Sequence, residues 1–252
     1  RLQPPTPSEQ TAMVACPSFE ALTGLLSHMG KALGGNLGAF EVMWQNHYRL
    51  LTETLGRHNP PIATEHPFYV IIESLGSDAE RNATQFREAL ESALAQELIV
   101  DAVIAQSSTQ RDGLWAIRED IEGLIQGLAP LFTFDVSLPI AEMQRYTDEL
   151  EAQLTQRWSD ARLVVFGHLG DGNLHISVSA GSAEVSVRRE VEAMVYQPLA
   201  TLGGSISAEH GIGLEKRPWL STCRSAAEME LMQTLKHALD PHRLLNRGKI
   251  LR

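Results

Sequence analysis

The stretch VVFGHLGDGNLHISV, residues 164–178, is the feature that most constrains this chain. Two apolar, strand-like runs flank a Gly/Asp/Asn cluster, and Asp171-Gly172 is a strong signal for a tight hairpin turn. A turn or four-residue loop (170–173) centred there places His168 opposite His175, with Cβ atoms roughly 4.5–5.5 Å apart. Two imidazoles at that spacing can converge on one cation. A half-exposed cross-strand pair without a ligand is the alternative, and the pattern alone leaves both open.

A metal site needs a further ligand, and the AEHG stretch offers Glu209 with His210 beside it. Neighbours in an extended segment point to opposite faces. If Glu209 faces the metal, His210 therefore points elsewhere unless the turn at Gly211 redirects it. Two histidines and a carboxylate with open positions suit Zn²⁺, Mn²⁺ or Fe²⁺. Taken by itself, the Glu209-His210 pair is better explained as part of a surface turn.

Two other charged positions each have a structural and a functional interpretation. Arg118 and Glu119 lie in a helical pattern, where a solvated pair is more common than a substrate clamp. Asp135 interrupts the apolar run LFTFDVSL and is either an edge charge or a buried functional carboxylate. The pattern does not decide between these interpretations.

The composition argues against several broad classes of function. The chain has 252 residues and a formal net charge of −10, whereas binding to nucleic acids or anionic membranes requires a basic face. Cys16 and Cys223 form no CxxC pair, which favours a reducing compartment such as the cytoplasm. No apolar run reaches the ~18 residues of a membrane-spanning helix, and no signal peptide is recognisable. We expect no nucleic-acid partner and no transmembrane segment, while peripheral membrane association stays open.

Strand-like and helical patterns alternate along the chain. The opening RLQPPTPSEQ, residues 1–10, is rich in proline and polar residues and is typical of a linker. Residues 11–252 form the expected domain, with a helix over 114–128 among others. Besides the hairpin, strands are expected near 11–16, 37–44, 68–75, 98–105 and 131–138. Hairpins mixed with single helices predict an α+β fold with a mostly antiparallel sheet flanked by helices.

Local start and stop signals refine these elements. Ser77 with Glu80, and Ser225 with Glu228, are spaced as capping boxes that predict helix starts. The segment SISAEHGIG, residues 205–213, is expected to be a short strand that enters a glycine turn.

Five motifs in order carry a resemblance to a known family. Along the chain they are LWAIRED, FDVSLPI, FGHLGDGNLHISV, SAEHGIGLEKRPWL and LDPHRLLNRGKIL. Together they resemble the C-terminal half of the FAD-linked 2-hydroxyacid oxidase/dehydrogenase family, among the vanillyl-alcohol-oxidase-type flavoproteins. That group contains D-lactate dehydrogenases, glycolate oxidase subunits and D-2-hydroxyglutarate dehydrogenases. The resemblance implies a substrate-binding (cap) domain, with residues 1–10 as the remnant of the linker to a missing N-terminal FAD-binding domain.

The resemblance also implies roles for individual residues. By it, His168, His175 and Glu209 are ligands of a divalent metal, Zn or Mn. By the same likeness, His210 takes the hydroxyl proton of the substrate while hydride leaves for the flavin. Arg118 resembles the residue that pairs with the substrate carboxylate, and a guanidinium suits that anion. Asn246 resembles the residue of a C-terminal tail that contacts the FAD.

The function that these likenesses imply is oxidation of a 2-hydroxy acid, of D configuration, to the 2-keto acid. The partners would be the small hydroxy acid, FAD and an unidentified electron acceptor, and a homodimer stays open. The chain alone would be inactive, because it carries no redox centre. A stand-alone metal-binding or regulatory module is the alternative from another class, and a metallohydrolase would use the same two histidines and glutamate.

Four positions depart from the family pattern. Many relatives have Lys where this chain has Thr133, and several have Asn where it has Ser177. The tail motif is more often NPGK, whereas Arg247 stands here. In relatives of the D-2-hydroxyglutarate type, a hydroxyl residue follows the arginine by one helical turn, where this chain has Glu122. Because like charges repel, we expect a substrate other than a typical 2-hydroxy diacid.

Overall fold

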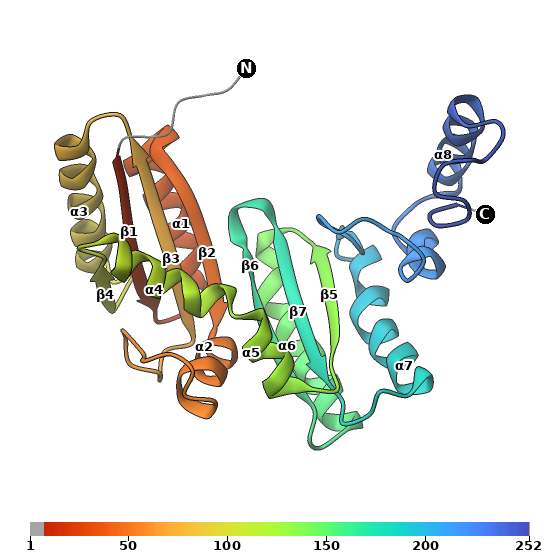
Figure 1. Ribbon diagram of the computed structural model, residues 1–252, viewed down its shortest axis with the longest axis horizontal. Helices are drawn as coiled ribbons and strands as arrows, with labels where there is room; N and C mark the ends of the chain where they lie inside the picture. The colour runs from red at the N-terminus through yellow and green to blue at the C-terminus, as the bar shows by residue number, and fades with distance from the viewer. Residues whose placement is uncertain (1–7, 252) are drawn as a thin grey trace. The chain divides into compact units, whose positions relative to one another are not determined.

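The computed structural model of the chain describes residues 8–251, and its elements fall into two units (Figure 1). Unit 1 comprises the described residues up to Ala129 together with Val164–Gly170. Unit 2 comprises Pro130–Leu163 and the described residues from Asp171 onward. Each unit is described by itself below.

In unit 1, apolar strands form an antiparallel sheet in the order β4-β1-β3-β2-β6. Strands β1 and β3 have neighbours on both sides and are buried along almost their whole length, which explains their near-continuous apolar sequences. The strands are β1 (Ser8–Cys16), β2 (Leu37–Trp44), β3 (Phe68–Gly76), β4 (Asp101–Ile104) and β6 (Arg162–His168), the last belonging to unit 1 from Val164 onward.

Helices cover both faces of the unit 1 sheet (Figure 1). On one face, α1 (Phe19–Leu33) packs with α3 (Ala79–Ala95). There the ring of Phe19 lies 5.8 Å from that of Phe68, centroid to centroid. The other face carries α2 (Gln45–Arg49), a π-helical turn (Leu50–Thr54), α4 (Ser108–Glu119) and α5 (Ile121–Leu128). Along each strand, successive side chains point to opposite faces of the sheet. The face covered by α4 carries the polar groups described below.

The helix expected over 114–128 is divided in two at Asp120. Asp120 leaves the helical conformation (φ −75°, ψ 67°), and its carboxylate accepts a hydrogen bond of 2.8 Å from the Gly123 amide, so it caps α5. Its oxygens also accept bonds from Arg57 Nε at 2.6 Å and Nη2 at 3.1 Å. The apolar periodicity continues across the break, so it does not reveal the cap.

Unit 2 is built on the antiparallel pair β5 (Phe132–Ser137) and β7 (Asn173–Ser179). Their side chains alternate strictly between two faces. Phe134 lies on the apolar face, where its ring meets that of Tyr196 on α7 at 5.5 Å. The opposite face is polar, because Thr133 pairs with Ser177 and Asp135 pairs with His175 in the register. The helices of unit 2 are α6 (Ile140–Arg157), α7 (Val185–Tyr196) and α8 (Ala226–Leu239), with short 3₁₀ turns at Gln197–Ala200 and Arg217–Thr222.

The predicted α+β class with antiparallel strands flanked by helices is confirmed. The strand expected at 37–44 and the capping box of Ser225 with Glu228 are found as predicted. No helix among residues 8–251 is long and apolar enough to cross a membrane.

Several predicted boundaries were wrong. Strand β1 begins at Ser8, three residues before the strand expected near 11–16 and within the stretch expected to be a linker; residues 1–7 lie outside the described part. Asp78, not Ser77, caps α3, because its side chain accepts from the Arg81 amide. The segment 205–213 is a loop with a single bridge from Ser205 to Ser137.

The turn between β6 and β7 spans 169–172, one residue earlier than the expected loop, and Gly172 supplies its left-handed conformation (φ +69°). A Cβ there would lie 2.9 Å from the Leu138 carbonyl oxygen, so glycine is required for steric as well as conformational reasons.

Replacing Asp120 by Ala is expected to lower the free energy of unfolding by about 1–2 kcal/mol, because it removes a helix cap and an ion pair whose arginine is partly exposed. The Arg57 bonds lower the pKa of Asp120 from 3.8 to about 2. The contribution of this carboxylate is therefore complete above pH ~4 and is lost as the pH falls through about 2. Urea unfolding at pH 7 and at pH 2.5 measures the difference, which should shrink at the lower pH. The exposed Asp112→Ala is the control, and an equal effect of both substitutions would contradict this account.

Candidate metal and substrate site

Asp135 is the organising residue of the polar face in unit 2. Its side chain is 1% exposed. Its Oδ2 atom accepts hydrogen bonds from the backbone amides of Ala208 (3.1 Å), Glu209 (2.8 Å) and His210 (2.9 Å). These three consecutive amides bend the loop around one oxygen, so a carboxylate on β5 sets the conformation of the segment that carries Glu209 and His210.

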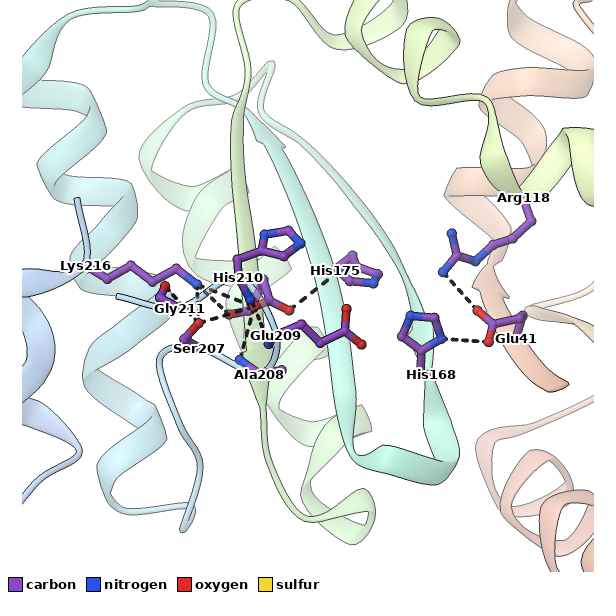
Figure 2. A network of polar contacts seen from close by, with 11 residues as sticks. Glu41, Arg118, His168, His175, Ser207, Ala208, Glu209, His210, Gly211 and Lys216 are labelled. Carbon is purple, nitrogen blue, oxygen red and sulfur yellow. Dashed lines mark hydrogen bonds and ion pairs between the residues drawn. The ribbon is translucent and has the colours of Figure 1, made fainter. Parts of the chain in front are cut away.

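The charges around Asp135 favour its ionised form. Burial disfavours ionisation, but the bonds from the His210 and Glu209 amides and the charge of Lys216 outweigh it and lower the pKa of Asp135. Lys216 Nζ lies 3.6 Å from Oδ2 and donates hydrogen bonds of 3.0 Å to the Asp135 carbonyl and to Ser207 Oγ (Figure 2). Burial lowers the pKa of Lys216 in turn. Of the two interpretations of Asp135, the structure supports the buried carboxylate.

Side chains with metal-ligating atoms gather on this face. Ligand atoms of Asp135, His175 and His210 lie within 4.8 Å of one another, and a His175 nitrogen lies within the same distance of a Glu209 oxygen. The rings of His175 and His210 are stacked, with centroids 5.9 Å apart. Within the described residues, Asp135 Oδ1 is buried without a hydrogen-bond partner. Imidazole nitrogens, carboxylates and an unsatisfied buried oxygen are a donor set that fits a divalent cation such as Zn²⁺ or Mn²⁺.

A second polar group lies in unit 1, around Glu41 (Figure 2). Glu41 and His168 are partners in the antiparallel register of β2 and β6, and His168 Nδ1 lies 2.7 Å from Glu41 Oε1. Arg118 Nη2, from α4, donates to Glu41 Oε2 at 2.9 Å. The Arg118 guanidinium also lies over the ring of Phe166, 4.5 Å from its centroid.

Arg118 and Glu119 differ in their exposure to solvent. The sequence left open whether they form a solvated pair or a substrate clamp. Arg118 is 8% exposed and forms a buried ion pair with Glu41, whereas Glu119 is exposed. The contacts with the Phe166 ring and the Glu41 carboxylate fix the position of this buried guanidinium. A guanidinium in a fixed position is suited to the recognition of an anion. The substrate role of Arg118 stays a prediction.

Asn246, the residue expected to contact FAD, lies in an exposed turn after α8. It adopts a left-handed conformation (φ +44°), and its carbonyl accepts from the Lys249 amide at 3.1 Å. Asn is among the residues that tolerate this conformation, so a structural reason for Asn at this position exists beside the cofactor role. Helix α8 has no buried residue, and Leu239, Leu244 and Leu245 are more than half exposed.

Glu41 is the site residue that the sequence analysis missed. It interrupts the apolar run LGAFEVMW, in the way that Asp135 interrupts LFTFDVSL. A single carboxylate in the middle of an apolar strand was the signal that could have found it.

Replacing Asp135 by Ala is expected to release the loop that carries Glu209 and His210. Three backbone donors would lose their acceptor, at about 1–3 kcal/mol for each donor that stays buried, so the loop is expected to open to solvent. Amide hydrogen exchange at residues 208–210 should accelerate by about tenfold or more, since ~1.4 kcal/mol corresponds to a factor of ten. Glu190→Ala, which removes an exposed carboxylate from α7 of the same unit, should leave these amides unchanged. Unaltered exchange in Asp135→Ala would show that the loop does not depend on the carboxylate.

Known proteins resemble this chain along almost its whole length. It is 38% identical to a D-2-hydroxyglutarate dehydrogenase of Xanthomonas citri pv. viticola, over 99% of this chain and 53% of that protein. It is 33% identical to the mitochondrial D-2-hydroxyglutarate dehydrogenase of Arabidopsis thaliana, over 99% of this chain and 44% of that protein. A putative mitochondrial D-lactate dehydrogenase of Schizosaccharomyces pombe is 33% identical, over 94% and 47%. The chain thus spans about half the length of the curated relatives it matches.

Solved flavoproteins of the vanillyl-alcohol-oxidase type share the fold at low sequence identity. The 4-ethylphenol oxidase of Gulosibacter chungangensis matches with a TM-score of 0.67 at 13% identity, over 100% of this chain and 55% of that chain. p-Cresol methylhydroxylase matches with a TM-score of 0.68 at 10% identity, over 97% and 53%. Residues 6–250 match the family described as FAD linked oxidases, C-terminal domain. With motifs, fold and relatives in agreement, the chain belongs to the C-terminal domain family of FAD-linked oxidases.

Proposed function

We propose that this chain is the substrate-binding domain of an FAD-dependent enzyme that oxidises a D-2-hydroxy acid to the 2-keto acid with metal assistance. The observation that carries the proposal is the polar face of unit 2, where a buried Asp135 holds Glu209 and His210 beside His175 in a member of this family. FAD, held mainly by a preceding domain, would supply the hydride acceptor.

His210 is the proposed base. Imidazole is well suited to accept a proton near neutral pH, and the ring of His210 is presented by an exposed loop whose backbone Asp135 fixes. Proton acceptance by this ring would accompany loss of the Cα hydrogen of the substrate as hydride, which leaves a carbonyl group. The positive charge of the ring would then lie close to the ionised Asp135, which stabilises it.

His168, His175 and Glu209 are the proposed ligands of Zn²⁺ or Mn²⁺. The donor set of unit 2 supports this assignment for His175 and Glu209, and the resemblance of the FGHLGDGNLHISV motif to the family supports it for His168. A divalent ion there would bind the hydroxyl and carboxylate oxygens of the substrate and lower the hydroxyl pKa. Arg118 is proposed to bind the substrate carboxylate, and Asn246 to contact the flavin.

The location and the partners of the whole protein are proposals as well. The relatives from Arabidopsis thaliana and Schizosaccharomyces pombe are named as mitochondrial proteins. We propose the cytoplasm as the location for this chain, because Cys16 and Cys223 form no disulfide with each other.

The proposal is tested on the full-length protein by its metal content, flavin content and bleaching of flavin absorbance by D-2-hydroxy acids. His168→Ala is expected to lose bound Zn or Mn. His210→Gln should keep the metal but bleach about 10²- to 10⁴-fold more slowly, because a general base contributes about that much. His28→Ala on α1, whose ring contacts Ala89 and Gln96, should resemble the unmodified protein.

Other results would favour other functions. Metal binding without flavin would favour a stand-alone metal-binding or regulatory module. Hydrolysis that needs the metal but no flavin would favour a metallohydrolase. Normal bleaching by His210→Gln would remove His210 as the base while leaving the reaction class intact.

Two departures from the family pattern face each other in unit 2, which bears on the choice of substrate. Thr133 and Ser177, where relatives often have Lys and Asn, are direct cross-strand partners next to the pair of Asp135 and His175. Both are small and uncharged, so neither side chain can form an ion pair with a further carboxylate of the substrate as a lysine at position 133 would. Glu122, at the fourth departure, ion-pairs with Arg57 at 3.6 Å.

We therefore expect the full-length flavoprotein to prefer 2-hydroxy monoacids to D-2-hydroxyglutarate. Flavin bleaching rates with D-lactate, D-2-hydroxybutyrate and D-2-hydroxyglutarate at equal concentrations measure the preference. Thr133→Lys should shift it toward the diacid, whereas Thr201→Lys, on the exposed turn after α7, should not. Faster bleaching by D-2-hydroxyglutarate in the unmodified protein would refute the expectation, although the proposed reaction class would stand.

A further inference from the structure

We infer that Glu41 is a positioning residue, which fixes the tautomer of His168 so that Nδ1 carries the proton and Nε2 carries the lone pair for a metal. The inference rests on the proposed function, because it assigns a role to Glu41 only if His168 is a ligand. It differs from that proposal in concerning a residue that touches neither the metal nor the substrate.

The backbone brings the two residues together before any side-chain choice is made. Glu41 on β2 and His168 on β6 are direct partners in the antiparallel register, so their Cβ atoms point to the same face. The resulting distance from His168 Nδ1 to Glu41 Oε1 is 2.7 Å, which is typical of a charge-assisted hydrogen bond. The contact is therefore built into the sheet and does not depend on a mobile loop.

The second oxygen of Glu41 decides which group is the donor. Oε2 accepts from Arg118 Nη2 at 2.9 Å in an ion pair whose side chains are both about 10% exposed or less. A carboxylate in such a pair accepts hydrogen bonds and does not donate them. His168 Nδ1 must then be the donor, so a neutral ring has its lone pair on Nε2. Metal-ligating histidines commonly donate their other nitrogen to a carboxylate in this way.

Arg118 is itself held in place by the architecture of α4. Trp115 and Arg118 are three residues apart and so lie on one side of the helix. Trp115 Nε1 donates to Glu73 Oε1 at 2.7 Å, while Arg118 reaches Glu41 on the neighbouring strand. The helix thus places one donor over each of two buried carboxylates, and only one of the two carboxylates contacts His168.

The other predicted ligand histidine shows a related arrangement in unit 2. Asp135 Oδ1 lies 3.8 Å from His175 Nδ1, which is longer than a hydrogen bond. Among residues 8–251, this buried oxygen has no hydrogen-bond partner. Both histidines therefore have Nδ1 near a buried carboxylate, within hydrogen-bond distance in His168 and at the longer distance in His175.

Glu41→Gln tests the inference at constant side-chain shape. The amide oxygen is expected to stay with the Arg118 cation, which turns the NH₂ group toward His168 Nδ1 and drives the proton to Nε2. In the full-length protein, ¹⁵N histidine spectra without metal should show His168 protonated at Nδ1 before the substitution and at Nε2 after it. Calorimetric titration with Zn²⁺ should show an affinity about 10- to 100-fold lower.

Two further variants separate the tautomer from general stability. Glu73→Gln makes the same change in a buried carboxylate of the adjacent strand that accepts from Trp115 and Thr11, and it should leave Zn²⁺ affinity and the His168 tautomer unchanged. Glu41→Asp keeps an acceptor-only group, so it should retain the Nδ1 proton and more of the affinity than Glu41→Gln. If Glu41→Gln does not fold, the His168 tautomer and the Zn²⁺ affinity can still be measured in Glu41→Asp.

The outcomes distinguish this inference from the proposed function. If His168→Ala leaves Zn²⁺ affinity unchanged, the metal proposal fails, while the spectra still report the tautomer. If His168→Ala abolishes binding but Glu41→Gln changes neither affinity nor tautomer, the inference is overturned and the metal proposal stands. Equal losses of affinity in Glu41→Gln and Glu73→Gln would also overturn it, because stability alone would then explain the effect.

Discussion

The buried carboxylate of Asp135 is the interaction on which the site of unit 2 depends. A charge that is 1% exposed would be expelled from a protein interior unless hydrogen bonds and counter-charges replaced water. Here three consecutive amides and Lys216 do so, and all of them belong to the segment 208–216. The need to satisfy one oxygen therefore dictates the path of the loop, and the positions of Glu209 and His210 follow from it.

The same constraint recurs in unit 1, where the central strands each carry one carboxylate among apolar neighbours. Glu73 on β3 is satisfied by Thr11 and Trp115, and Glu41 on β2 by Arg118 and His168. A carboxylate with more than one acceptor site can join groups from different elements. Burying such a carboxylate costs free energy, and the bonds that it accepts hold its partners in a fixed geometry. The roles proposed for His168 and Arg118 require such a geometry.

Much of the fold could be predicted from local patterns, because they are set by residues close in sequence. The β2 boundaries, the capping box at Ser225 and the antiparallel class are of this kind. The apolar periodicity did not reveal the break at Asp120, because the pattern continues across it, and the bond from Arg57, 63 residues away, leaves no mark in the local sequence. The loop at 205–213 looked like a strand, because its pattern does not reveal that its amides bind Asp135, 73 to 75 residues earlier.

The candidate site divides along the same line. The residue types of His168, His175, Glu209 and His210 could be identified from motifs, and a carboxylate inside an apolar strand marks Asp135 and Glu41. The contacts that these two carboxylates make could not be predicted, because their partners come from distant elements. Arg118 shows the limit most clearly: 77 residues separate it from Glu41, and the helical pattern favoured solvent exposure. A guanidinium has donors on several nitrogens and can serve more than one anion. If Arg118 binds both Glu41 and a substrate carboxylate, substrate binding and the orientation of His168 are coupled through one buried side chain. A substitution at Arg118 would then alter metal affinity as well as substrate affinity, which a purely substrate-binding arginine would not.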